Sequence, residues 1–198
     1  MLRRGFKTEA ERIAAEARGL VGVSKSSPLP ARALAKKLEV TIVGPLEIPG
    51  FPEGLATQML VQYAAKWSAC TFKAGERHFI LHNTTHESPR QESNLMHELA
   101  HVWLKHKPDK IEPPGRLPFP IRSFNEDQED EAKWLGGCFQ IPRDALLGLL
   151  RRRLDNIAIA AYFNASEEMV RYRRNLTGID AQISRSSAFQ GASIRRRA

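Results

Sequence analysis

A His-Glu-x-x-His pattern occupies residues 97 to 101 of the chain. Histidines four residues apart lie on the same face of an α-helix, so His97 and His101 can bind one metal ion together. Glu98 follows the first histidine, where its carboxylate can act as the general base for a water molecule that the ion activates. This combination is typical of zinc proteases. The pattern therefore predicts a metal site that hydrolyses peptide bonds.

The residues around the pattern bear on a simpler explanation, in which the histidines are ordinary packed or surface residues of a helix. Three fixed positions in five residues also occur by chance. Apolar residues nevertheless flank the pattern at helical spacing, namely Leu95, Leu99, Val102 and Trp103, and they predict a largely buried helix. Burying two histidines and a glutamate without partners is unfavourable, and a bound divalent ion offsets that cost. The context thus favours a metal site.

A second helix is expected to supply the third ligand that such a site needs, which is frequently a glutamate. Residues 124–142 read as a helix with an acidic first half that ends at Pro142. Acidic residues also suit the N-terminal end of a helix dipole, so the cluster alone identifies no ligand. The apolar face of this helix is formed by Ala132, Leu135, Gly136 and Phe139. Glu129 lies nearest to that face and Glu131 comes next, so periodicity prefers Glu129.

Composition places the chain among globular proteins with one main domain. It has 198 residues, of which 42% are hydrophobic and 26% charged,. It contains no apolar run of about 18 residues and its N-terminus does not resemble a signal peptide, so we expect a cytoplasmic protein without a membrane segment. Cys70 and Cys138 do not form a Cys-x-x-Cys pair, and both are expected to be reduced, buried thiols.

The positive charge is concentrated near the C-terminus. The whole chain carries a formal charge of +8, and the part from Arg143 onward has eleven arginines, five acidic residues and no lysine, a net of +6. Residues 157–163 and 169–176 read as two helices joined by a capped turn, with helix-turn-helix rhythm. Nucleic acid is therefore one candidate partner of this arginine-rich region, although short helical hairpins are also common packing units.

Hydrophobic periodicity and turn residues predict the remaining elements. A helix is expected at 8–20, capped by Thr8. The other expected elements are a helix at 31–38, strands at 40–43, 55–65, 67–72 and 77–82, a turn at 73–76, loops at 83–91 and 108–122, and a helix at 143–154. Residues 181–198, rich in serine and arginine, are expected to form a flexible tail.

The chain resembles the ImmA/IrrE family of bacterial and phage metallo-endopeptidases, which are similar to gluzincins. The resemblance covers roughly residues 8 to 178. Besides the pattern at 97–101, it rests on the alanine-rich N-terminal helix, the Ala-x-x-Leu segment after it, and residues 79–83, 90–91, 129–132, 141–142 and 163–166. It implies an α+β fold: a mostly helical, zincin-like domain at 1–142 with a small antiparallel sheet, a helix-turn-helix-like segment at 143–178 packed on it, and a flexible basic tail at 179–198.

The resemblance also implies a ligand set. In the family, the third ligand is the glutamate of a Glu-x-x-Ala pattern, which falls on Glu129 here and agrees with the helical face. The chain departs from the family at Lys133, where Asn or Asp is usual, at Ala100, where glycine is usual, and at residues 135–137. Lys133 and Glu131 are therefore candidates for residues that surround the ligands, and a cation at 133 would either weaken metal binding or pair with an acid.

The function expected from these features is that of a zinc-type metallo-endopeptidase with His97, His101 and Glu129 as ligands. Manganese also suits such a site. Candidates for binding the substrate or the oxyanion are His78, His82 and Tyr63. By resemblance, the substrate is a helix-turn-helix transcriptional repressor, and its cleavage relieves repression under stress or in mobile elements. The alternative is a non-catalytic regulator that binds a repressor or DNA and carries a structural or vestigial metal site.

Overall fold

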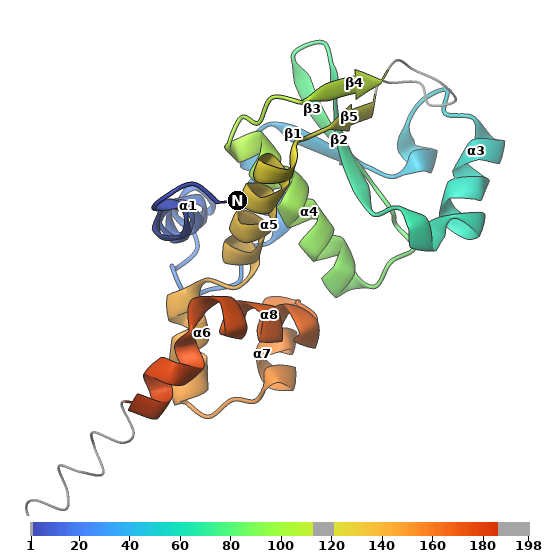
Figure 1. The fold of residues 1–198 in the computed structure, drawn as a ribbon. Helices are drawn as coiled ribbons and strands as arrows, with labels where there is room; N and C mark the ends of the chain where they lie inside the picture. Colours follow the sequence, from blue (N-terminus) through green and yellow to red (C-terminus); the bar gives the residue numbers. More distant parts are fainter. Residues whose placement is uncertain (1, 113–120, 186–198) are drawn as a thin grey trace, which may run out of the picture.

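Helices α4 and α5 cross at the centre of the fold, with the β-strands at one end and the C-terminal helices at the other (Figure 1). This computed structural model describes residues 2–112 and 121–185. Its helices are α1 (Phe6–Val21), α2 (Ala31–Lys37), α3 (Glu53–Thr57), α4 (Ser88–Trp103), α5 (Glu126–Gln140), α6 (Arg143–Arg151), α7 (Asn156–Phe163) and α8 (Glu167–Thr177). The strands are β1 (Val40–Val43), β2 (Ala69–Ala74), β3 (Arg77–His82), β4 (Lys110–Glu112) and β5 (Ile121–Ser123). The predicted α+β class is confirmed.

The main sheet has the order β1-β3-β2 and is mixed, whereas the sequence predicted an antiparallel one. β2 and β3 form the expected hairpin, whose turn contains Gly75 with a φ of 59°, a conformation that glycine adopts without steric cost. β1 instead pairs with β3 in parallel. The long connection between β1 and β2 makes this possible, because parallel neighbours cannot be joined by a tight turn.

Residues 55–65 are helical rather than a strand, which corrects the prediction from composition. α3 is followed by helical turns at Gln58–Gln62 and Ala64–Lys66. Leu55, Ala56 and Met59 follow one another at helical spacing. Their side chains pack on the face of the sheet that carries Phe72 and Leu81. β-branched and apolar residues in this stretch suggested a strand, but the positions that are buried have the helical period.

The main core lies on the opposite face of the sheet, between α1, α2, α4 and α5. Ile80 of β3 points into it, together with Leu95 and Leu99 of α4. α5 approaches α4 closely at Gly136, where an added Cβ atom would lie 3.1 Å from the backbone nitrogen of His97. Glycine inside a helix costs roughly 0.5–1 kcal/mol relative to alanine. Here it permits the contact that brings the acidic end of α5 beside the histidines.

Helices α6 to α8 enclose a second apolar cluster, which is centred on Ile141, Leu146, Ile159, Phe163 and Val170. α7 and α8 form the predicted helical hairpin, in which Asn164 is left-handed and the Ser166 side chain caps α8 by accepting from the Met169 backbone. The boundary at residue 142 between two domains stays a prediction.

Arg173 of α8 joins this cluster to the main core. Its guanidinium is fully buried, donates to the Ile141 carbonyl oxygen at 2.9 Å and pairs with Glu11 of α1. Gly137 makes room for it, since a Cβ atom there would lie 3.1 Å from the Arg173 Cδ atom. Glu11 also accepts from the Arg143 backbone nitrogen at 3.0 Å. This contact therefore ties α1, α5, α6 and α8 together.

Replacing Arg173 with methionine is expected to lower the free energy of unfolding by about 3 kcal/mol, because the Glu11 carboxylate loses its buried ion pair and the Ile141 carbonyl loses its side-chain donor. Arg171→Met provides the matched control. Arg171 is on the same helix, is exposed and, among the described residues, pairs only with Glu167 one turn away, so its loss should cost less than about 0.5 kcal/mol. Urea unfolding followed by circular dichroism measures both; equal effects would contradict the assigned role.

Three further expectations need correction. α1 begins at Phe6 behind the left-handed Gly5, two residues before Thr8, because the Phe6 ring is fully buried in the core. The expected loop 108–122 includes β4 and β5, which pair with each other, while residues 113–120 lie outside the described part. The expected tail starts too early at 179: residues 179–185 are helical and Ile179 is fully buried, while 186–198 lie outside the described residues.

Among the residues that the structure describes, no helix combines the length and apolar character needed to cross a membrane.

Candidate metal centre

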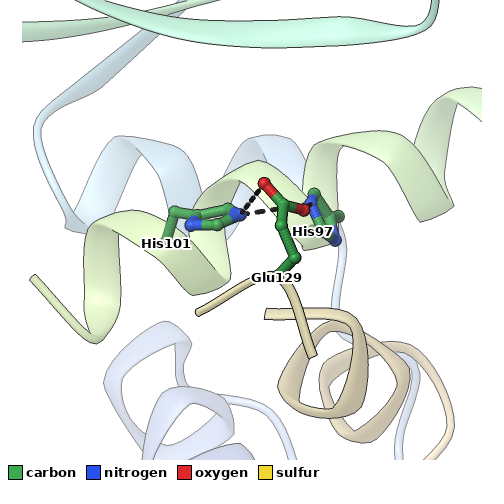
Figure 2. Close-up of side chains that lie close together, drawn as sticks. All are labelled: His97, His101 and Glu129. Atoms are coloured by element: carbon green, nitrogen blue, oxygen red, sulfur yellow. Dashed lines mark hydrogen bonds and ion pairs between the residues drawn. The ribbon is translucent and has the colours of Figure 1, made fainter. Parts of the chain in front are cut away.

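His97 and His101 of α4 and Glu129 of α5 converge on one point (Figure 2). The Nε2 atoms of the two histidines are 3.2 Å apart, and the Nε2 atom of His97 is 3.1 Å from Oε2 of Glu129. The Nε2 atom of His101 is 3.7 Å from the other carboxylate oxygen. The three residues that the sequence predicted as ligands are therefore brought together, across an interval of 32 residues between the first and the last.

These separations suit a tetrahedral metal ion. Ligand atoms about 2.0–2.1 Å from a tetrahedral zinc ion are roughly 3.3 Å from one another, close to the spacing of the three side chains. Two imidazole nitrogens and a carboxylate oxygen are also a donor set that zinc binds in catalytic sites, where a fourth position stays open. The residues present thus fit a divalent ion.

The ionisation of the three side chains supports the same interpretation. Burial, followed by the neighbouring His97, lowers the pKa of His101 to about 3, so this imidazole is neutral near pH 7,. The hydrogen bond with His97 lowers the pKa of Glu129, which keeps it a carboxylate. Burial opposes a charged His97, but Glu129 and Glu98 outweigh it and raise the pKa of His97. Metal binding would displace a proton from His97.

Glu98 is buried beside the triad and is held by Thr71 of β2. The Thr71 hydroxyl donates to Oε2 of Glu98 at 2.6 Å. Burial raises the pKa of Glu98 above its usual range, which makes this carboxylate a stronger base than an exposed one,. Both residues line the same hollow as His97, His101 and Glu129. The structure therefore places the expected general base next to the three predicted metal ligands.

His106 supports His101 from behind. The chain leaves α4 through Lys105, whose φ of 54° is left-handed, and the backbone nitrogens of Lys105 and His106 donate to the carbonyl oxygens of Val102 and His101. This is the Schellman ending of a helix. It turns His106 back, so that its Nδ1 lies 3.0 Å from Nδ1 of His101, while its Nε2 lies 3.3 Å from Oε2 of Glu131.

The donor and acceptor directions available to these hydrogen bonds suit a role of His101 as a metal ligand. If Nε2 of His101 bound an ion, its Nδ1 would carry the proton and donate to His106, which would in turn donate to Glu131. Arg3 binds the other oxygen of Glu131 at 2.9 Å. Glu131, a candidate from the sequence, thus acts on His101 through His106, and Glu129 alone of the two glutamates contacts the histidine pair.

His106→Ala is expected to weaken zinc binding roughly 10–100-fold, the usual effect of removing a hydrogen-bond partner of a metal ligand. Competition titration with a chromogenic chelator measures the dissociation constant. His78→Ala is the matched control, because His78 lies on β3 and does not line the hollow of the triad. If His106→Ala and wild type bound zinc equally well, the contact between His106 and His101 would have no role in metal binding.

Three hollows follow α4 and adjoin one another through shared lining residues; together they are termed the cleft. The metal hollow, about 360 Å³, contains the triad, Glu98 and residues 68–71 that lead into β2. The N-terminal hollow, about 340 Å³, shares Asn94, His97 and Glu129 with it and extends to Met169 of α8. The C-terminal hollow, about 800 Å³, shares Thr71, His101 and Phe124 with the metal hollow. The cleft thus passes the metal ligands near its middle.

The other residues predicted for the site do not line the metal hollow. His82 is buried against Arg32, with 3.2 Å between their side-chain nitrogens, and burial lowers its pKa. Tyr63 is half exposed and lies beside Lys66. Of the three hollows of the cleft, His78 lines the C-terminal one alone. Lys133 lines the N-terminal hollow, and its ammonium lies over the ring of Tyr172, 5.4 Å from the centroid.

The sequence interpretation missed Thr71, His106 and Phe124. The Phe124 ring stacks on the His101 imidazole, with centroids 3.9 Å apart. A third histidine soon after the pattern was a usable signal for His106, since one helical turn and a reversal can return it to His101. No local signal marks Thr71 or Phe124, because both reach the site from other elements.

Three arginines of α8, in the arginine-rich region that made nucleic acid a candidate partner, have partners within the protein. Arg173 is buried, Arg171 pairs with Glu167, and Arg174 binds Asp180 at 2.8 Å and Asn156 at 2.7 Å. A partner for this region stays a prediction.

Comparison with known proteins relates these features to a family. No curated protein and no solved structure shows a significant match to the chain. A family model, Peptidase_M78, described as the IrrE N-terminal-like domain, matches residues 58–175. The match spans more than half of the chain and contains α4, α5 and every member of the triad. The protein therefore belongs to the IrrE N-terminal-like family of peptidases.

Proposed function

We propose that the protein is a metal-dependent endopeptidase of the His-Glu-x-x-His type, with His97, His101 and Glu129 as ligands of a zinc ion. The convergence of these three side chains from two helices supports the proposal most directly. A divalent ion held there supplies Lewis-acid activation of water and of the substrate carbonyl. Manganese can occupy the same donor set.

Glu98 has the properties of the general base in this proposal. Its carboxylate takes the proton of the attacking water and later delivers it to the leaving amine. The raised pKa of Glu98, caused by burial, favours the first transfer, and the hydroxyl of Thr71 keeps the carboxylate directed into the metal hollow.

The edge of β2 is a suitable place for the substrate backbone. β2 pairs with β3 along one side, and within the described residues no strand forms a hydrogen-bonded ladder with its other side, although β5 of the second sheet lies close to β2. Residues 68–71 border the metal hollow. An extended peptide can add to such an edge by main-chain hydrogen bonds, which requires no particular substrate sequence.

For the substrate, we propose a helix-turn-helix transcriptional repressor, whose cleavage relieves repression under stress or in mobile elements. Support comes from the resemblance to the ImmA/IrrE family. The test incubates the zinc-loaded protein with a candidate helix-turn-helix repressor, chosen from the genes beside its own, and identifies new N-termini by mass spectrometry. Cleavage at one site that a chelator abolishes is expected. An intact repressor, with cleavage of other peptides, would contradict this substrate and leave the peptidase function standing.

A further inference from the structure

The C-terminal hollow differs from the rest of the cleft in being both apolar and basic. Its apolar wall is formed by Leu38, Val102, Trp103 and Phe124. These side chains come from the end of α2, the end of α4 and the segment after β5. An apolar hollow of about 800 Å³ is large enough for one bulky side chain together with its neighbours in a peptide.

Three lysines, Lys73, Lys105 and Lys107, border this wall. Among the described residues that line the hollow none is acidic, and within the same part of the chain these lysines take part in no ion pair. The positive charge of the rim is therefore not neutralised by the protein where the structure describes it. The N-terminal hollow contrasts with this, because there Lys133 is accompanied by Asp130 and Glu129.

The position of the hollow connects it to the site of hydrolysis. Thr71, His101 and Phe124 line both this hollow and the metal hollow. Thr71 and Lys73 point to the same face of β2, since alternate residues of a strand share a face. A peptide that follows the edge of β2 past the metal ligands thus reaches the lysine rim two residues later.

We propose that the C-terminal hollow selects the substrate: it takes a bulky apolar side chain next to an acidic one, close to the bond that is cut. The apolar wall buries the first side chain, and the lysine rim attracts the second. This inference rests on the proposed peptidase function and adds the substrate class to it.

Binding is tested apart from cleavage. Zinc-loaded Glu98→Gln protein is titrated with fluorescein-labelled octapeptides of alanine whose two central residues are Phe-Asp, Phe-Asn, Phe-Lys or Ala-Asp. Fluorescence anisotropy gives the dissociation constants. The Phe-Asp peptide is expected to bind roughly 3–10-fold more tightly than Phe-Asn, from two partly exposed ion pairs, and more tightly than Ala-Asp.

Charge reversal tests the lysines themselves. In the Glu98→Gln background, Lys73→Glu/Lys107→Glu should reverse the order, so that Phe-Lys binds more tightly than Phe-Asp, while Phe-Asn is unchanged. The control Lys25→Glu/Arg152→Glu alters the net charge equally at positions that line none of the three hollows, and it should retain the preference for Phe-Asp. A reversal by the control as well would reduce the effect to net charge and overturn the inference.

The same peptides, in quenched fluorogenic form, are given to the wild-type protein. Preferential cleavage of Phe-Asp supports both the peptidase and the selective hollow. Cleavage without preference among Phe-Asp, Phe-Asn and Phe-Lys would overturn substrate selection by the C-terminal hollow and leave the peptidase function standing. Charge-dependent binding without cleavage of any peptide, or of the repressor, would support peptide selection by the hollow and contradict the peptidase function.

Discussion

Glu98→Gln is expected to retain zinc at wild-type stoichiometry and to lose peptide cleavage by about 10²–10⁴-fold, the usual contribution of a general base. Glutamine has nearly the shape of glutamate and can still accept the hydrogen bond from Thr71. It cannot take a proton from water. Cleavage of a fluorogenic peptide measures the rate, and metal analysis by mass spectrometry measures the stoichiometry.

Stability distinguishes a loss of chemistry from a loss of structure. Burial raises the pKa of Glu98, so at pH 7 the ionised carboxylate is less favourable in the folded than in the unfolded protein,. The neutral glutamine removes that cost, and the metal-free variant should therefore unfold at the same temperature as wild type or higher. Glu126→Gln, an exposed change on α5, serves as the control. Wild-type activity of Glu98→Gln would refute the assignment of the base.

Glu129→Ala is expected to abolish stoichiometric metal binding after dialysis. Removing the carboxylate leaves only the two histidines, and the loss of affinity should exceed the roughly 10–100-fold that follows removal of a partner of a ligand. Glu131→Ala is the informative comparison, because Glu131 lies on the same helix but contacts His106 instead. Its effect should stay within the 10–100-fold range.

Competition titration gives the zinc affinity of these two variants and of a third, Asp130→Ala, and so shows which glutamate contributes more to metal binding. Glu129→Ala is expected to have the lowest affinity for zinc and Glu131→Ala an intermediate one. The control Asp130→Ala, which removes an exposed acid between them, should bind zinc about as tightly as wild type. A ranking with Glu131→Ala weakest would show that the third ligand had been assigned to the wrong glutamate. Equal affinities in all three would exclude a ligand from this part of α5.

The local pattern of the sequence was sufficient to predict the helix at 97–101 and the shared face on which its two histidines lie, with the glutamate beside them. The spacing of four residues determines that His97 and His101 share a face, whatever the rest of the chain does. The helical face of α5 also singled out Glu129, in agreement with the resemblance to the family. The structure brings these side chains together as the helical spacing implies, because backbone hydrogen bonds between near neighbours set the period of a helix. Their roles as ligands and base stay predictions.

Composition failed where tertiary packing decides the structure. Residues 55–65 contain apolar side chains that suit a strand or a helix, and the sheet face carrying Phe72 selects the helical spacing. β1 pairs with β3 in parallel although nothing in its four residues encodes the direction. In both cases the partner lies far along the chain, and short apolar segments accept either structure.

The sequence by itself thus determined the chemistry available to this protein: two imidazoles and a carboxylate base on one helix, with an acidic helix to follow. Only the tertiary structure decided which other groups complete the site. Gly136 lets α5 approach α4, so that Glu129 reaches the histidines, and the reversal at Lys105 returns His106 to His101. Thr71 arrives from β2 to hold Glu98. Such contacts join residues distant in the chain, and their distances depend on how whole elements pack, which no local spacing encodes.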